Sequence, residues 1–220
     1  MNANTERHGL PALVTLLVMV FSMTACSSAY YSALEKVGIE KRDILIDRID
    51  DTRDAQDEAK EQFTSALEQY RAVIDIDGGE LEKTYDRLNA EYERSEQIAD
   101  EVSNRIDAVE DVAGDLFEEW EREIETYSDA GLARTSRNLL RDTRAEYAQV
   151  IRAMKRAEQS MAPVLTLFND QVLFLRHNLN ARAIGALQGE LANIERATAE
   201  LVAEMERSIA EADRFIQSIK

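Results

Sequence analysis

Few residues in this chain have side chains suited to covalent or catalytic chemistry. The 220 residues include one cysteine, Cys26, and two histidines, His8 and His177. A single cysteine excludes a disulfide within one molecule and a zinc site built from cysteines. Nucleophilic catalysis needs a positioned base, and the neighbours Asn178 and Asn180 favour a turn or capping role for His177. We therefore expect no enzymatic activity, no bound metal and no cofactor.

The acidic residues are numerous but do not form an identifiable catalytic pair. The chain has 43 acidic and 26 basic residues, with a formal net charge of −17. A general acid and base must lie in environments that separate their pKa values, and most of these carboxylates fall at solvent-facing positions of a helical repeat. The same charge repels phosphates, so nucleic acid is excluded as a partner, as is attachment to anionic lipid by surface charge alone.

Cys26 lies at the end of a segment typical of protein export. The range Leu10–Met23 runs fourteen residues without a charge, which is short for a membrane span but suits a signal peptide. Met23-Thr24-Ala25-Cys26 then resembles the bacterial lipobox, with Met23 where leucine is usual. The alternative is an ordinary cleaved signal that happens to precede a cysteine. We predict a lipoprotein signal peptide over residues 1–25 and one domain over 26–220.

The lipobox resemblance implies that Cys26 is acylated and becomes the new N-terminus. Each buried methylene contributes about 0.8 kcal/mol, so two or more acyl chains anchor a protein stably. Ser27 is not the aspartate that typically retains such lipoproteins in the inner membrane. The predicted location is therefore the periplasmic face of the outer membrane, with the inner membrane less favoured.

The elements that would position any site are long helices. Two prolines and eight glycines in 220 residues indicate an all-α fold. Between residues 81 and 127, apolar residues recur at alternating steps of three and four, which is typical of a coiled-coil seam. Its members are Leu81, Tyr85, Leu88, Tyr92, Ala99, Val102, Ile106, Val109, Ala113, Leu116, Trp120 and Tyr127, with polar Ser95 and Glu123 at the remaining steps.

Similar seams occur in three further segments. The first reads Leu45, Ile49, Thr52, Gln56, Ala59, Phe63, Ala66, Tyr70 and Val73. We predict helices at about 30–76, 80–128, 132–179 and 183–219, with Pro163 kinking the third helix rather than ending it. Short breaks make consecutive helices antiparallel, which gives an up-down-up-down four-helix bundle. Pairing of two hairpins between chains is the alternative, so monomer and dimer both remain open.

Charge supports the pairing of the second and third helices. Residues 80–125 contain 17 acidic and 5 basic residues, and residues 132–182 contain 9 basic and 4 acidic ones. Exposed ion pairs are weak, so we expect them to select the neighbouring helix more than to stabilise the fold. The predicted interhelix pairs join Glu110, Asp111, Asp115, Glu118 and Glu119 to Arg134, Arg137, Arg141 and Arg144.

The bundle topology brings the first and third breaks together at the end far from Cys26. Beyond Pro163 the apolar face widens to include Val172, Leu173 and Phe174, so the core is widest near this end. Simple closure of the core is the alternative to a binding role. The candidate partner-binding residues are Asp77, Gly78, Gly79, His177, Asn180 and Arg182.

At Gly78-Gly79 and along residues 173–184 (LFLRHNLNARAI) the chain resembles a family of Gram-negative bacterial lipoproteins known only as a domain of unknown function. The resemblance covers essentially the whole mature chain. It implies a helical, lipid-anchored envelope protein and supplies no catalytic residues. We expect a periplasmic scaffold or adaptor that binds an envelope protein partner. The alternative is a binding module for an apolar or amphipathic small ligand in the half of the bundle far from Cys26.

Overall fold

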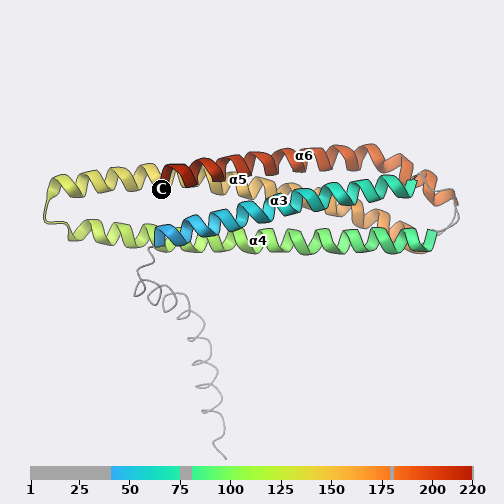
Figure 1. Cartoon of the computed structure of the whole chain (residues 1–220), viewed down its shortest axis with the longest axis horizontal. Coiled ribbons are helices and arrows are strands. Elements are labelled where there is room, and N and C mark those ends of the chain that lie inside the picture. The colour runs from blue at the N-terminus through green and yellow to red at the C-terminus, as the bar shows by residue number, and fades with distance from the viewer. Residues whose placement is uncertain (1–40, 75–80, 179–180, 220) are drawn as a thin grey trace, which may run out of the picture. The chain divides into compact units, whose positions relative to one another are not determined.

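The computed structural model describes residues 41–74, 81–178 and 181–219. These residues form four helices, α3 (Lys41–Ile74), α4 (Leu81–Thr126), α5 (Ala130–His177) and α6 (Ala181–Ile219), and include no strand (Figure 1). The predicted all-α fold is confirmed. The predicted helix ends differ from these bounds by about two residues, the usual uncertainty of a helix end. The predicted start of the first helix near residue 30 lies outside the described residues.

The chain divides into two compact units, residues 1–44 and residues 45–220. Of the first unit, the described residues are Lys41–Ile44, which form the first turn of α3. The packing below is that of the second unit.

Each helix of the second unit contacts two others through polar side chains on its flanks. Low-numbered residues of one helix meet high-numbered residues of the next, so consecutive helices are antiparallel, and α6 returns to α3. This is the predicted four-helix bundle (Figure 1). The contacts are Gln62–Glu91 between α3 and α4 (2.8 Å), Ser103–Glu158 between α4 and α5 (2.6 Å), Ser218–Glu146 between α6 and α5 (2.7 Å) and Arg71–Glu195 between α3 and α6 (2.6 Å).

The seam predicted for α3 is buried at every position, from Leu45 to Val73. Three of its residues, Thr52, Gln56 and Tyr70, carry polar groups into the interior. The Thr52 hydroxyl donates a hydrogen bond to the backbone carbonyl of Arg48 at 2.7 Å. The interior of the bundle is therefore apolar with a small number of polar positions.

The seam predicted for α4 is buried at Leu88 and from Ser95 to Ala113, whereas Tyr85 and Tyr92 are only partly buried and the seam positions beyond Ala113 are not buried. The structure buries Phe117 and Ile124, whereas Glu123 is exposed and Tyr127 is 46% exposed. A strict seven-residue repeat assumes 3.5 residues per turn, and a straight helix has 3.6. The difference rotates the buried face by about 20° per heptad, which over several heptads moves it one residue further along the chain.

The start of α5 is set by Asp129, which caps the helix. Its Oδ1 accepts hydrogen bonds from the backbone N–H groups of Gly131 (2.6 Å) and Leu132 (3.0 Å). These bonds stabilise the ionised carboxylate and lower the pKa of Asp129. A Cβ atom at Gly131 would lie 2.9 Å from this oxygen, so a larger residue there would displace the capping carboxylate. The helix then continues through Pro163 to His177.

The widening of the apolar face of α5 was predicted too broadly. Val172 is buried, but Leu173 is 47% exposed and Phe174 is 37% exposed. Successive side chains of a helix point about 100° apart, and a helix in a bundle turns only one face toward its neighbours. The segment has apolar residues on all sides of the helix, but the neighbouring helices cover only part of that surface.

Candidate functional site

The predicted partner-binding cluster at the far end of the bundle is placed only in part. His177 is the last residue of α5 and is exposed, and Arg182 lies in the first turn of α6. The other members, Asp77, Gly78, Gly79 and Asn180, lie outside the described residues, as does the predicted acylation site Cys26. The cluster and the acylation site therefore stay predictions.

The interior on this side of the bundle is filled by side chains that contact one another. The hydroxyl of Tyr70 donates a hydrogen bond to the backbone carbonyl of Leu187 at 2.8 Å and lies 3.4 Å from Oε1 of Gln171. Its ring meets Phe168 edge-on, with centroids 6.1 Å apart. All four residues are buried. A small apolar ligand at this level would have to displace side chains that already pack.

Burial also raises the pKa of the Tyr70 hydroxyl, and the negative charge of Glu190 adds to the effect. Both causes disfavour the tyrosinate. Tyr70 therefore stays neutral and acts as a hydrogen-bond donor rather than as a base.

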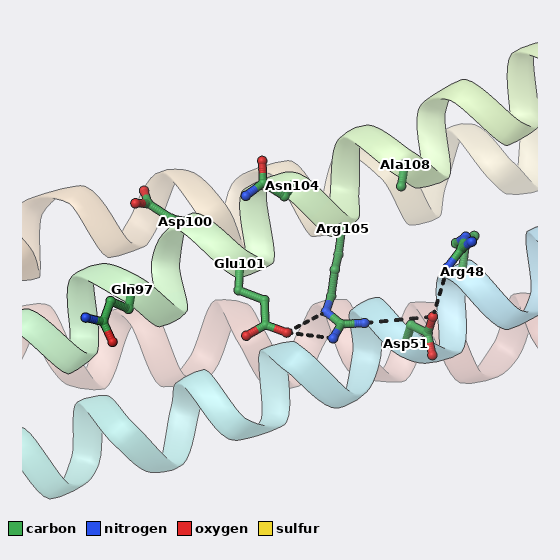
Figure 2. Close-up of a pocket in the computed structure, with 8 residues that line it drawn as sticks. All are labelled: Arg48, Asp51, Gln97, Asp100, Glu101, Asn104, Arg105 and Ala108. Atoms are coloured by element: carbon green, nitrogen blue, oxygen red, sulfur yellow. Dashed lines mark hydrogen bonds and ion pairs between the residues drawn. The ribbon is translucent and has the colours of Figure 1, made fainter. Parts of the chain in front are cut away.

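A surface groove of about 440 Å³ lies between α3 and α4. Polar and charged side chains from both helices line it, and Figure 2 shows them. None of the lining side chains is a histidine, cysteine or serine. The lining residues are Arg48, Asp51, Gln97, Asp100, Glu101, Asn104, Arg105 and Ala108.

Arg105 connects the two walls of this groove. Its guanidinium donates hydrogen bonds of 3.0 and 2.6 Å to Glu101 on its own helix, and it lies 3.8 Å from Asp51 of α3. Arg48 approaches the same Asp51 oxygen at 3.4 Å (Figure 2). The bond to Glu101 is the main cause of the raised pKa of Arg105. The network fastens α4 to α3 through paired charges and offers hydrogen-bonding groups to a polar ligand.

The ion pairs of Arg105 were not predicted from the sequence. Glu101 and Arg105 have the i,i+4 spacing of a helical ion pair, so the bond between them is predictable from the sequence. Which residues of α3 face this pair depends on the alignment of two helices, and the sequence pattern alone does not define that alignment to within one turn.

Of the four α5 arginines predicted to pair with α4, Arg144 alone does so in the described ranges, and its partner Glu121 is not one of the five predicted carboxylates. Arg144 binds Glu121 of α4, and this hydrogen bond lowers the pKa of the Glu121 carboxyl. Arg141 binds its own neighbour Asp142 at 2.9 Å. Within the described ranges, no ion pair joins Arg134 or Arg137 to another residue. A further α4–α5 pair, Lys155–Glu110 at 2.7 Å, was not predicted.

Aromatic side chains reinforce the contact between α4, α5 and α6. The ring of Tyr147 meets Phe117 of α4 at 5.4 Å and Phe215 of α6 at 6.4 Å, both edge-on. The guanidinium of Arg144 lies over Phe117, 5.2 Å from the ring centroid. This cluster therefore joins three helices of the bundle.

In the ranges that the structure covers, no group of histidine, cysteine, aspartate or glutamate residues is arranged to hold a metal ion. None of the helices described has both the length and the apolar character required to cross a bilayer.

The comparisons with known proteins give a family and no described activity. No curated protein and no solved structure matches the chain. Residues 30–219 match the model of the family described as "Protein of unknown function (DUF2959)". Because this match spans most of the sequence, the chain belongs to that family of uncharacterised proteins.

Proposed function

We propose that this chain is a lipid-anchored helical scaffold or adaptor of the bacterial envelope, without a catalytic role, that binds an envelope protein partner. The observation that carries the proposal is the place of its one cysteine. Cys26 ends the Met23–Cys26 lipobox-like sequence, and the family match begins at residue 30. A signal, an acylation site and a folded domain thus follow one another directly.

The described part of the chain supports a scaffold in two ways. The bundle interior is filled by its own side chains, including Phe63, Tyr70 and Leu187. The outer faces of the helices carry paired charges, such as those around Arg105. These faces are exposed to solvent, so a protein partner could bind them. No contact in the described ranges favours the small-ligand alternative.

Acylation is tested with the full chain expressed in a Gram-negative host supplied with an alkyne-tagged palmitate. We expect label on the unchanged chain and none on Cys26→Ala, which should accumulate as a larger precursor. A wild-type chain that stays unlabelled and soluble after cell lysis would overturn the anchor.

The location is tested by separating inner and outer membranes on a density gradient. The labelled chain should sediment with the outer membrane. The matched variant Ser27→Asp should move toward the inner membrane, because aspartate after the acylated cysteine typically retains lipoproteins there. Equal distribution of both chains would contradict the sorting argument.

A further inference from the structure

The two halves of α3 are held in the bundle in different ways. In the C-terminal half, residues 62–74, side chains form hydrogen bonds to other helices in the interior. Gln62 donates to the carboxylate of Glu91 of α4 at 2.8 Å, and the Tyr70 hydroxyl donates to the backbone carbonyl of Leu187 of α6 at 2.8 Å. Glu91, Tyr70 and Leu187 are all buried. These bonds fix the C-terminal half against both neighbouring helices.

The N-terminal half, residues 45–59, has two buried polar side chains, and neither bonds to another helix. We call this half the strap. The hydroxyl of Thr52 donates to the backbone carbonyl of Arg48, on α3 itself, at 2.7 Å. Both polar atoms of the Gln56 amide are buried, and in the described part of the chain neither has a hydrogen-bond partner. A buried amide without partners is costly, so Gln56 favours conformations in which water reaches the strap.

The contacts of the strap at the bundle surface are weak. Arg53 pairs with Asp213 of α6 at 3.1 Å, and Asp51 lies 3.8 Å from Arg105 of α4. Ion pairs between partly exposed side chains contribute little to stability. The groove of about 440 Å³ lies between the strap and α4. Extensive approach of backbones, with Cα atoms within 8 Å of each other, occurs between α5 and α4 and between α5 and α6, and α3 takes no part in it.

Apolar packing also holds the strap less firmly than the rest of α3. Its large buried apolar residues are Leu45 and Ile49, and its other buried apolar positions are the alanines Ala55 and Ala59. Hydrophobic stabilisation grows with the apolar area that is buried, so the alanines contribute little. The C-terminal half buries Ala66 and a longer run of larger side chains, namely Phe63, Leu67, Tyr70, Val73 and Ile74.

We propose that the strap detaches from α4 and α6 as one unit, while residues 62–74 and the other three helices stay packed. Opening gives the Gln56 amide access to water, which offsets part of the cost of exposing Leu45 and Ile49. Both of these side chains are fully buried in the closed bundle, so the closed form remains the major one.

Opening of the strap uncovers apolar surface of α4. Asp51 of the strap approaches Arg105, so Val102 and Ile106, on either side of Arg105 in the sequence, lie at the level of the strap. Both are fully buried in the closed bundle. The open form thus presents an apolar face that the closed form hides. This device does not depend on the lipid anchor or on the adaptor function proposed above.

Hydrogen–deuterium exchange of the full chain, measured by mass spectrometry, tests the proposal. The amides of the strap should exchange at least about tenfold faster than those of residues 62–74 on the same helix. Low urea concentrations should barely change the exchange rate of the strap, because a local opening exposes little surface. Equal protection of the two halves would overturn the proposal. Protection that rises residue by residue from position 45 would also overturn it, because that is fraying from the helix end.

Two variants separate opening of the strap from unfolding of the whole bundle. Gln56→Leu should slow exchange of the strap by about tenfold, because it removes the buried unpaired amide from the closed form. The matched control Tyr70→Phe removes a bond of the half that stays packed. It should speed exchange of residues 62–74 and leave exchange of the strap unchanged. Faster exchange of the strap in Tyr70→Phe would show that both halves open together, and unchanged exchange of the strap in Gln56→Leu would show that the amide does not drive opening. Either result would overturn the proposal.

Discussion

Tyr70 of α3 donates a hydrogen bond of 2.8 Å to the backbone carbonyl of Leu187 of α6, in the interior of the bundle. Both residues are fully buried. A buried hydroxyl without a partner is costly, so this bond determines which residues of α3 and α6 face each other as well as contributing to stability.

Tyr70→Phe removes this bond and keeps the ring. We expect the free energy of unfolding to fall by about 0.5–1.5 kcal/mol, as for a typical intramolecular hydrogen bond. Urea unfolding monitored by circular dichroism measures it. The matched control is Tyr92→Phe, because the Tyr92 hydroxyl bonds to Glu96 at 2.8 Å on an exposed face. Equal losses from the two variants would show that burial of the Tyr70 bond has no effect.

Alkaline pH should destabilise the bundle through Tyr70, which is buried, and Tyr147, which is partly buried. Burial raises the pKa values of Tyr70 and Tyr147 above the ordinary value of 10.0. Below pH 10 both hydroxyls are neutral in the folded and the unfolded chain, and the stabilising effect is fully present. Above pH 10 the unfolded chain loses these protons first, so stability falls as the pH rises.

Urea midpoints at pH 9, 10 and 11 check this dependence. The double variant Tyr70→Phe/Tyr147→Phe should show a shallower decrease between pH 10 and 11 than the unchanged chain. If both chains lose stability with the same slope, other groups are responsible for the alkaline transition.

The fold was predictable because long seams repeat regularly in all four helices, and one buried stripe per helix is enough to define a bundle. The exact buried face of α4 was not predictable, because the choice between Leu116 and Phe117 depends on a small difference in residues per helical turn that accumulates along the helix. For Leu173 and Phe174 the composition was misleading, since apolar character does not show which side a neighbour covers.

The candidate site was less predictable than the fold. The ion pairs of Arg105 and Arg144 depend on the alignment of neighbouring helices to within one turn, and many acidic residues on each flank could serve as partners. The exposure of Leu132 and Leu139 was also hidden from the sequence, because the heptad pattern gives the face of a residue and not the level at which a neighbouring helix ends.

Gln56 is a polar core residue that should reduce stability. It is fully buried, and neither atom of its amide has a hydrogen-bond partner. The ion pair between Arg53 and Asp213, at 3.1 Å, aligns this part of α3 with the turn of α6 that contains Ser208, another buried group without a partner. Gln56→Leu should raise the free energy of unfolding by about 1–3 kcal/mol, the cost of a buried unsatisfied group.

Urea unfolding of Gln56→Leu measures this gain, and the control is Gln97→Leu on the exposed wall of the α3–α4 groove, for which we expect little change. A loss of stability in Gln56→Leu would mean that the amide is satisfied in solution. Ser208→Ala, alone and combined with Gln56→Leu, tests whether the two groups interact, since a coupling energy above about 0.5 kcal/mol shows that they do.

Arg144 and Arg137 should respond differently to substitution, although both were predicted to pair with α4. Arg144 binds Glu121 and lies over the ring of Phe117, whereas no ion pair joins Arg137 to another residue in the described ranges. Arg144→Ala should lower the free energy of unfolding by about 0.5–1 kcal/mol through the lost cation–π contact. Arg137→Ala should change it by less than about 0.5 kcal/mol, as is usual for surface substitutions.

Arg144→Lys keeps the charge and loses the planar guanidinium, so an intermediate urea midpoint would assign part of the effect to stacking. Equal midpoints for Arg144→Ala and Arg137→Ala would contradict a specific role for Arg144, and the preference of α4 for α5 would then rest on apolar packing alone.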